Sequence, residues 1–251
     1  MCRILILFSI NFLSLSLLAQ IGFNKKYLIG PLNPFYHCVW AGGDTIAVSG
    51  VAYSPDPLID KQGLLFAKID TNGNILDYHI YHDALGEHFV GEASDNFIKL
   101  KDGSGYMMVG AALPRENGVL LKLDDNGNQI FVKEYVDTSS NVDIYQQIIE
   151  LNNGFLIAGS KSRWGPQLDV FVMKVSKHGT KIWEKFFGFD YEYDYLGSLL
   201  RVNENEFVVG TLSTYPPGFL ANTYKYTNKI FAIDSLGNTK WHWESPFSKE
   251  E

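Results

Sequence analysis

Short apolar runs that end in glycine recur four times along the chain. They occupy residues 45–50, 106–110, 155–159 and 207–210, so the closing glycines lie 60, 49 and 51 residues apart. A second apolar run follows each of them and leads into a turn with its own glycine, at Gly73, Gly127, Gly179 and Gly237. Because both glycine series keep a spacing of about 50 residues, the sequence is predicted to consist of structural repeats.

Within one repeat the pattern predicts four strands, and the third repeat displays them most clearly. Residues 147–151 and 155–159 flank an Asn-Asn-Gly segment, which is typical of a hairpin turn because Asn and Gly tolerate positive φ. The second strand and the third, residues 169–175, are almost continuously apolar, as expected for strands covered on both faces. The fourth, residues 181–187, alternates more regularly, which favours an outer strand with one face in water.

Four-stranded sheets that repeat at this period and stack face to face are the blades of a β-propeller. The predicted fold is therefore all-β, a propeller of four-stranded antiparallel blades. A sandwich of ordinary hairpins is the alternative, although a sandwich would not require a fixed period. The propeller region is assigned to residues 20–251, with repeats at 31–81, 90–135, 143–187 and 195–244.

An extra strand-like segment precedes the first repeat. Residues 23–30 carry the run Phe-Asn-Lys-Lys-Tyr, which parallels the outer-strand patterns at 131–135 and 183–188. Propellers often close by joining strands from both chain ends into one blade, which removes open sheet edges. We therefore expect 23–30 to belong to a closing blade, the ring of four repeats to be incomplete, and the natural chain to continue past Glu251. The alternative is a complete four-bladed ring with a spare N-terminal strand.

The first residues differ in character from the repeats. Arg3 precedes an apolar stretch from Ile4 to Leu18, and the small Ala19 follows. This pattern is typical of a signal peptide, residues 1–19, and it predicts a protein that is secreted or held at the cell surface, with the periplasm as a further location. An uncleaved anchor helix is the alternative, but a stretch of about 15 residues is short for a span, so no membrane span is expected after cleavage.

The net charge bears on which partners the protein can bind, and the cysteine content bears on whether disulfide bonds can stabilise it. The formal net charge is −7 and no long run of Lys or Arg occurs, so nucleic acid is not an expected partner. Cys2 would leave with the signal peptide, and Cys38 alone cannot form an internal disulfide. Cys38 lies in an apolar first strand, where a buried, inert thiol is expected. We expect a monomer stabilised by packing.

The turns at 70–74, 124–128 and 234–238 raise a calcium hypothesis because each begins with Asp and ends with Gly-Asn. Glycine is fourth in these turns, however, whereas an EF-hand loop needs it at the sixth position. The Asp side chain is instead expected to cap the turn by bonding its own backbone, while the glycine takes positive φ.

A second metal hypothesis concerns the densest group of metal-ligating residue types. Two of its members, His79 and His82, stand three residues apart on a predicted strand and therefore point to opposite faces. The other members lie in a polar connection. A solvated loop is therefore favoured, and neither a metal site nor a cofactor is predicted. The group consists of His79, His82, Asp83, Glu87 and His88.

The connection at 188–195 interleaves acidic residues with tyrosines. As a loop between blades it would offer aromatic rings and carboxylate acceptors to a sugar or a peptide. The alternative is a strand crossing with its tyrosines packed on the rim, and Asp143 recurs at the equivalent place before the preceding blade, as a shared structural turn would require. The candidate ligand-binding residues are Asp190, Tyr191, Tyr193, Asp194 and Tyr195.

Motifs with a catalytic mechanism are missing from the sequence. It contains no Gly-x-Ser-x-Gly elbow, no His-Glu-x-x-His pair, no phosphate-binding loop and no dinucleotide fingerprint. No catalytic residue is therefore predicted, although an active site assembled from carboxylates of several blades would leave no motif.

The turn glycine is followed four residues later by a large aromatic residue in three repeats, at Phe131, Trp183 and Trp241. Residues 232–241, Ala-Ile-Asp-Ser-Leu-Gly-Asn-Thr-Lys-Trp, resemble the tryptophan-docking motif of pyrroloquinoline-quinone-type propellers, in which an Asp-Gly turn leads to a Trp packed between blades. The first repeat departs from it with Asp77 in the aromatic place, and the third has Ser176 for Asp. Residues 23–244 as a whole resemble the secreted repeat proteins of Bacteroidetes that the type IX system often exports.

This resemblance is specific for architecture. It favours an exported, non-enzymatic propeller that acts as a binding, adhesion or scaffold module, with a glycan or protein ligand at the inter-blade loops. The alternative function is an enzyme with its active site in the propeller channel, such as a quinone-dependent dehydrogenase, which would need a polar channel and a cofactor.

Overall fold

The computed structural model describes residues 33–53, 62–82, 88–90, 95–113, 117–137, 142–162, 167–188, 193–215, 225–246 and 248–249. All of the regular secondary structure in these ranges consists of β-strands. The predicted signal peptide, 1–19, and the predicted closing strand, 23–30, lie outside them. None of the described segments forms a helix that is long and apolar enough to cross a membrane.

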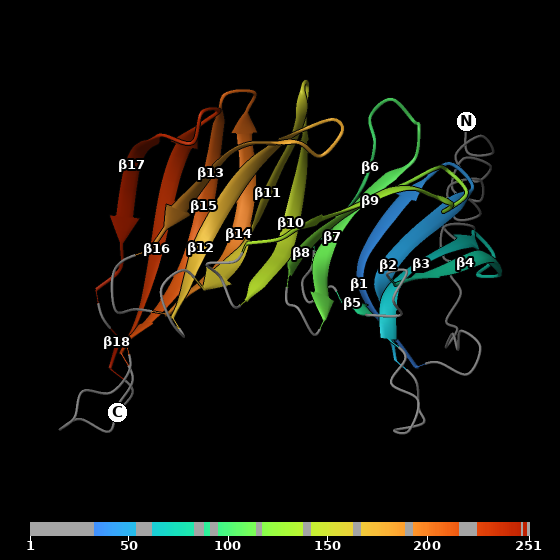
Figure 1. Ribbon diagram of the computed structural model, residues 1–251, viewed down its shortest axis with the longest axis horizontal. Coiled ribbons are helices and arrows are strands. Elements are labelled where there is room, and N and C mark those ends of the chain that lie inside the picture. The colour runs from blue at the N-terminus through green and yellow to red at the C-terminus, as the bar shows by residue number, and fades with distance from the viewer. Residues whose placement is uncertain are drawn as a thin grey trace, which may run out of the picture.

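The strands form four antiparallel sheets in chain order (Figure 1). Sheet 1 contains β1 (Asn33–Gly42), β2 (Thr45–Tyr53), β3 (Gln62–Asp70) and β4 (Ile75–Tyr81). Sheet 2 contains β5 (His88–Val90), β6 (Phe97–Lys99), β7 (Tyr106–Leu113), β8 (Asn117–Leu123) and β9 (Gln129–Tyr135). Sheet 3 contains β10 (Asp143–Leu151), β11 (Gly154–Ser162), β12 (Leu168–Ser176) and β13 (Lys181–Phe187). Sheet 4 contains β14 (Tyr193–Asn203), β15 (Glu206–Tyr215), β16 (Lys225–Asp234) and β17 (Thr239–Glu244), and the short β18 (Ser248–Lys249) also pairs with β16.

Sheet 2 differs from the others because its first strand is split. The short β5 pairs with one end of β7, at 111–113, and β6 pairs with the other end, at 106–108. Between them, the Asn96 side chain donates a hydrogen bond to the Val109 carbonyl oxygen at 3.3 Å, and the Val109 amide donates to the Asn96 carbonyl at 2.9 Å. Two short strands and one asparagine thus take the place of a continuous first strand.

The sheets stack in a row, and apolar side chains fill the space between neighbours (Figure 1). Phe66 of sheet 1 packs against Tyr106 of sheet 2 with ring centroids 5.1 Å apart. The central β11 is buried along its whole length, whereas the outermost β17 is exposed along its whole length. The predicted fold class is therefore confirmed as all-β with four-stranded antiparallel blades. Sheets 1 and 4 lie at opposite ends of the row, and the described residues do not show ring closure.

A glycine turn joins the third and fourth strands of each sheet, as predicted. Gly127 has a φ of +85°, and the corresponding glycines of the other sheets have φ between +73° and +80°. Asp124 Oδ1 accepts hydrogen bonds of 2.8 Å from the backbone amides of Asn126 and Asn128, and Oδ2 accepts one of 2.9 Å from the Asn128 side chain. The interpretation of the Asp as a turn cap is confirmed.

Candidate functional site

The two ends of the sheets differ in their connections. At one end, here called the turn end, short turns join the first strand to the second and the third to the fourth. At the opposite loop end, the second strand joins the third and each sheet joins the next, through segments as long as 54–61 and 216–224. Binding residues concentrate on loops that a rigid scaffold positions, so the loop end is the expected place for a ligand site.

Three of the predicted ligand-binding residues lie at the start of β14, at the loop end of sheet 4. Tyr193 and Tyr195 pair with Thr214 and Leu212 of β15 and therefore share one face of the sheet. Tyr195 is 43% exposed, and Tyr193 is half-buried. The remaining candidates, Asp190 and Tyr191, lie outside the described residues. Ligand binding at this loop stays a prediction.

Asp194 points to the opposite face, toward sheet 3, and is fully buried. Its Oδ1 accepts a hydrogen bond from the Ser213 hydroxyl and lies 3.9 Å from the Lys229 ammonium, which is buried as well. A Cβ atom placed on Gly188 would lie 2.5 Å from Asp194 Oδ2 and 2.8 Å from Asp169 Oδ1. Glycine at 188 therefore leaves room for two carboxylates to approach each other beside the end of β13.

A second buried ammonium group lies between sheets 2 and 3. Lys161 Nζ is 2.7 Å from Asp137 Oδ2, 3.3 Å from Asp143 Oδ2 and 3.3 Å from Glu184 Oε1. Burial alone would lower the pKa of Lys161, but the hydrogen bond from Asp137 and the three carboxylate charges outweigh it and raise the pKa above its ordinary value. The lysine therefore stays charged and ties two sheets together.

These two lysines were missed by the sequence reasoning, which considered only the acids around them. Lys161 has a sequence signal, because it stands among the apolar and small residues of β11, whereas Lys229 stands among other polar residues of β16 and has none. A lysine in such a place is buried only when carboxylates accompany it. Asp143 and Asp194 open the first strands of successive sheets and each lies beside one of these lysines, which supports the shared structural turn that was the alternative interpretation.

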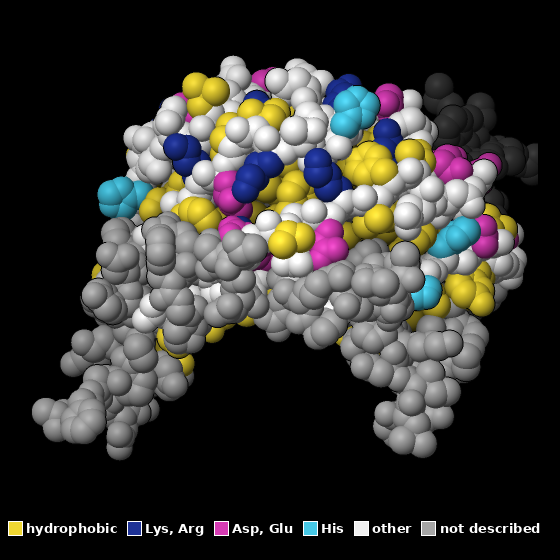
Figure 2. Space-filling model, in the orientation of Figure 1, with side chains coloured by type: hydrophobic (Ala, Val, Ile, Leu, Met, Phe, Trp, Pro, Cys, Tyr) yellow, Lys and Arg dark blue, Asp and Glu magenta, His cyan; other side chains and the backbone are white. Residues whose placement is uncertain are grey.

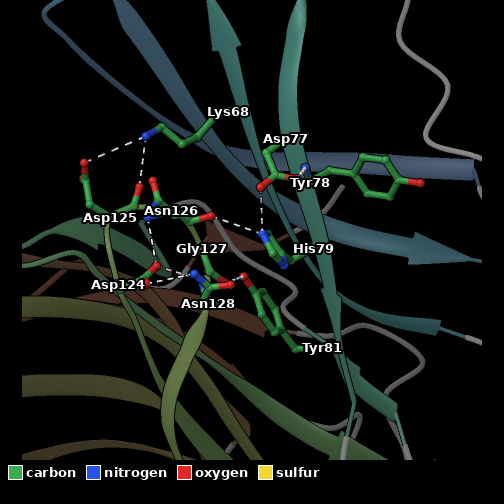
Figure 3. Close-up of polar contacts among 10 residues, drawn as sticks. All are labelled: Lys68, Asp77, Tyr78, His79, Tyr81, Asp124, Asp125, Asn126, Gly127 and Asn128. Atoms are coloured by element: carbon green, nitrogen blue, oxygen red, sulfur yellow. Dashed lines mark hydrogen bonds and ion pairs between the residues drawn. The ribbon is translucent and has the colours of Figure 1, made fainter.

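At the turn end, the glycine turn of sheet 2 contacts the preceding sheet 1 (Figure 3). The Tyr81 hydroxyl of sheet 1 donates a hydrogen bond to the Gly127 carbonyl of sheet 2 at 2.5 Å, and His79 Nε2 lies 3.1 Å from the Asn126 carbonyl. Burial, followed by the charges of Asp124 and Asp77, raises the pKa of Tyr81, so its hydroxyl remains a donor at any physiological pH. His79 lies on a strand, β4, as predicted, and its ring takes part in the contact between sheets 1 and 2.

The same contact recurs between the later sheets with different side chains. The Tyr135 hydroxyl donates to the Gly179 carbonyl at 2.7 Å, which links sheets 2 and 3. Between sheets 3 and 4 the Trp183 ring takes the place of the hydroxyl, since a Cβ on Gly237 would lie 2.9 Å from it. At each of these three contacts, here called the joint between sheets, an aromatic side chain of one sheet lies against the turn glycine of the next, and only the kind of contact differs.

The other chemistry of the described residues is modest. Cys38 is half-buried in β1, its Sγ donates to the Phe97 carbonyl at 3.6 Å, and burial raises the pKa of the thiol. No group of three or more His, Cys, Asp or Glu side chains among the described residues is arranged to hold a metal ion. A polar cavity of about 260 Å³ lies between sheets 3 and 4 at the turn end, lined in part by Asn152, Lys174 and Glu204.

The visible surface gives no sign of a single dominant charge. Figure 2 shows basic side chains across the middle of this face, with acidic and apolar side chains beside them.

Comparison with known proteins finds similarity in structure alone. No protein-family model matches the chain, and no curated protein sequence matches it. One similar crystal structure is that of a "putative hydrolase" from Bacteroides ovatus, with 13% identity and a TM-score of 0.41 over 80% of this chain. Another is that of a eukaryotic initiation factor, with 9% identity and a TM-score of 0.34 over 84% of this chain. The matched region spans 61% and 64% of those two chains.

Proposed function

We propose that this chain is an exported, non-enzymatic binding, adhesion or scaffold module that contacts a glycan or protein ligand at the loop end of sheet 4. The observation that carries the proposal is that neighbouring side chains at the start of β14 lie on opposite faces of the sheet, one exposed and one buried. Tyr195 is 43% exposed on one face, while Asp194 is buried on the other beside Lys229. Tyrosine combines a large apolar ring with a polar tip and suits a recognition surface.

The buried charges next to this face support a structural role for the ionic groups. Lys161 is surrounded by three carboxylates, and Lys229 lies beside Asp194. A general base or nucleophile must be able to reach a substrate atom, whereas these groups contact one another between sheets. This arrangement favours a binding module over an enzyme with its active site at the same place.

Export is proposed on the sequence of residues 1–19 and on the resemblance to secreted Bacteroidetes repeat proteins. The resemblance to the tryptophan-docking motif gains support from Trp183, whose ring lies against the turn glycine Gly237 of the next sheet. Fractionation of the producing cells, with N-terminal sequencing of the mature protein, tests the export. A mature chain that starts at Gln20 in the medium or on the cell surface is expected, and a full-length chain retained in the cytoplasm contradicts export.

Binding is tested by incubating the purified protein with a glycan array and with solubilised cell-surface proteins. The wild type is expected to retain a ligand without converting it, and Tyr195→Ala is expected to weaken that binding about tenfold, since an interfacial tyrosine is often worth more than 1 kcal/mol. Tyr78→Ala is the matched control, because Tyr78 is 44% exposed in sheet 1. An equal loss in both variants, or turnover of the retained ligand, contradicts the proposal.

A further inference from the structure

Three positions at the turn end can be compared at every joint between sheets. The first lies on the third strand of the earlier sheet, where Lys68, Lys122 and Lys174 have equivalent partners on the fourth strand. The second lies on the first strand of the later sheet, and the third directly follows the residue that caps its glycine turn. The pairing register identifies the same positions in each sheet, so their charges can be compared directly.

The joint between sheets 1 and 2 fills these positions with two lysines and an aspartate. Lys68 Nζ donates a hydrogen bond to the Asp125 carbonyl oxygen at 3.0 Å and lies 3.9 Å from Asp125 Oδ2 (Figure 3). Lys99 Nζ forms an ion pair with Asp125 Oδ1. Both lysine side chains are largely buried, and the shared carboxylate offsets the cost of removing two ammonium groups from water.

The joint between sheets 2 and 3 carries the same charges in a different order. Lys122 holds the first position. Glu150 holds the second, by its place in the register of β10 and β11, and Lys177 holds the third, directly after the cap Ser176. Two cations and one carboxylate therefore occupy the three positions at both of these joints.

The joint between sheets 3 and 4 keeps both cations and lacks the carboxylate. Lys174 Nζ donates a hydrogen bond to the Ser235 carbonyl oxygen at 3.5 Å, which repeats the backbone contact made at the first joint. Arg201 holds the second position, since its place in the register of β14 and β15 matches that of Lys99 in β6 and β7. Ser235 stands where sheet 2 has Asp125, so the third position is uncharged.

The polar cavity of about 260 Å³ between sheets 3 and 4 lies at this joint. Its lining includes Lys174, Ser235 and the three asparagines Asn152, Asn153 and Asn205. Glu204 also lines the cavity, but its carboxylate forms an ion pair with Arg201. Lys174 has no ion pair within the part of the chain that the structure describes. The cavity thus presents an ammonium group without a carboxylate, at the joint where the charge pattern lacks one.

The lining indicates the chemistry of a ligand. A carboxylate would make with Lys174 the charge-assisted contact that Asp125 makes with Lys68. Amide side chains both donate and accept hydrogen bonds, as hydroxyl groups do, so the three asparagines suit a hydroxyl-rich ligand. A free amino acid would also need an acceptor for its ammonium group, but Glu204 is already paired with Arg201. The volume is below the roughly 300–1,000 Å³ of sites for drug-sized ligands, so it suits one sugar unit.

We propose that the cavity between sheets 3 and 4 binds an acidic sugar, a hexuronate unit, whose carboxylate contacts Lys174 and whose hydroxyl groups contact the asparagines. The ligand carboxylate takes the place that Asp125 fills between sheets 1 and 2. The bound sugar joins two sheets and stabilises the fold by the free energy of binding. The site lies at the turn end, opposite Tyr195, so it is a second site that does not depend on the binding surface proposed at the loop end.

Isothermal titration calorimetry of the purified protein with D-glucuronate and D-galacturonate tests the site, with D-glucose as the neutral counterpart. One of the uronates is expected to bind at least about tenfold more tightly than glucose, because only a uronate can neutralise Lys174. Lys174→Met removes the ammonium group and is expected to abolish this preference. Ser235→Asp supplies the carboxylate from the chain itself, as in sheet 2, and is expected to exclude the uronate. Lys122→Met is the matched control and is expected to bind like the wild type, because Lys122 holds the equivalent position at the joint between sheets 2 and 3.

Ser235→Asp keeps the site testable if Lys174→Met fails to fold, since it leaves Lys174 in place. The proposal is overturned if neither uronate binds more tightly than glucose, or if Ser235→Asp retains the wild-type affinity for the uronate. Acetate that binds as tightly as the uronate also overturns it, because the asparagines would then contribute nothing. Tyr195→Ala is expected to retain uronate binding. A loss in Tyr195→Ala but not in Lys174→Met would place the sugar at the loop end and overturn this site.

Discussion

Gly127 is required for two separate reasons at the scale of a single residue. Its φ of +85° lies in the left-handed region, where a side chain strains the backbone. In addition, a Cβ at this position would lie 2.6 Å from the Phe66 ring and 2.7 Å from the His79 ring of sheet 1. The first requirement is local, and the second exists only because two sheets meet here.

The two requirements can be separated by comparing Gly127→Ala with Gly103→Ala. Gly103 lies in the same sheet with a φ of +74°, and a Cβ there would have nothing within 4 Å. We expect Gly103→Ala to cost about 1 kcal/mol of stability for backbone strain, and Gly127→Ala to cost about 1–3 kcal/mol more for the clash. The free energies of unfolding from urea titrations measure the difference. Equal losses would show that the turn does not hold sheet 2 against sheet 1.

Residue-scale features could be predicted from the sequence wherever the cause was local. The Asp cap and the positive φ of Gly237 depend on atoms within a five-residue turn, and both were predicted from the residue types. The carboxylates around Lys161 come from three different strands or connections, so their meeting is set by how sheets stack. Asp194 was a candidate ligand contact. Its burial could not be foreseen, because the sequence does not show which residues of β14 point toward sheet 3 and which point away from it.

At the scale of elements, the third sheet carries the weakest of the four turns. Ser176 stands where the other sheets have Asp, and its hydroxyl accepts longer hydrogen bonds, 3.3 Å from the His178 amide and 3.1 Å from the Thr180 amide. The corresponding bonds to the Asp234 carboxylate are 2.9 Å long, and their donors lower the pKa of Asp234. A charged acceptor makes the stronger bond.

Ser176→Asp is therefore expected to stabilise the protein at neutral pH, and Ser176→Ala to destabilise it. The pKa of the new carboxyl should be lowered in the folded state, as it is for Asp234. A group with a lowered folded pKa contributes stability above its unfolded pKa of about 3.9, and that contribution is lost as the pH falls through the folded value. Urea midpoints measured at pH 7 and below pH 3 check this. A gain of the same size at both pH values would show that the charge is not its cause.

Strand positions were predicted well where apolar runs were continuous. The predicted strands at 155–159 and 169–175 lie within β11 and β12, which are buried between sheets 2 and 4. The division of the first strand of sheet 2 into β5 and β6 was not predicted. It depends on Asn96, whose side chain bonds the neighbouring strand, and a single polar residue gives no periodic signal.

At the scale of the whole molecule, the inner and outer sheets should differ in local stability. β12 and β16 hold the same third position, but sheet 3 has a neighbour on each face, whereas sheet 4 has one face exposed. In repeat assemblies, stability is roughly a sum over repeats and their interfaces. Amide hydrogen exchange at low protein concentration is expected to be at least about tenfold faster in β16 than in β12. Equal protection would indicate that the row of sheets unfolds as one unit.

The stacking of sheets was predictable at this scale because the glycine turns recur at a fixed spacing. The environment of individual tryptophans was not. The resemblance to a docking motif implies a Trp packed between blades for both Trp183 and Trp241, and Trp183 fits this description. Trp241 is 48% exposed, because no described sheet lies on the outer side of sheet 4. Equivalent sequence positions thus acquire different roles from their place in the row.

The joint between sheets has a consequence for how such a chain changes over generations. Sheet 3 takes part in two joints: its turn glycine, Gly179, contacts the sheet before it, and its aromatic residue Trp183 contacts the turn glycine of the sheet after it. A duplication of about 50 residues therefore copies both halves of the joint together. Blades can be gained or lost by unequal recombination without inventing a new interface, and the loop-end residues remain free to diverge in every copy.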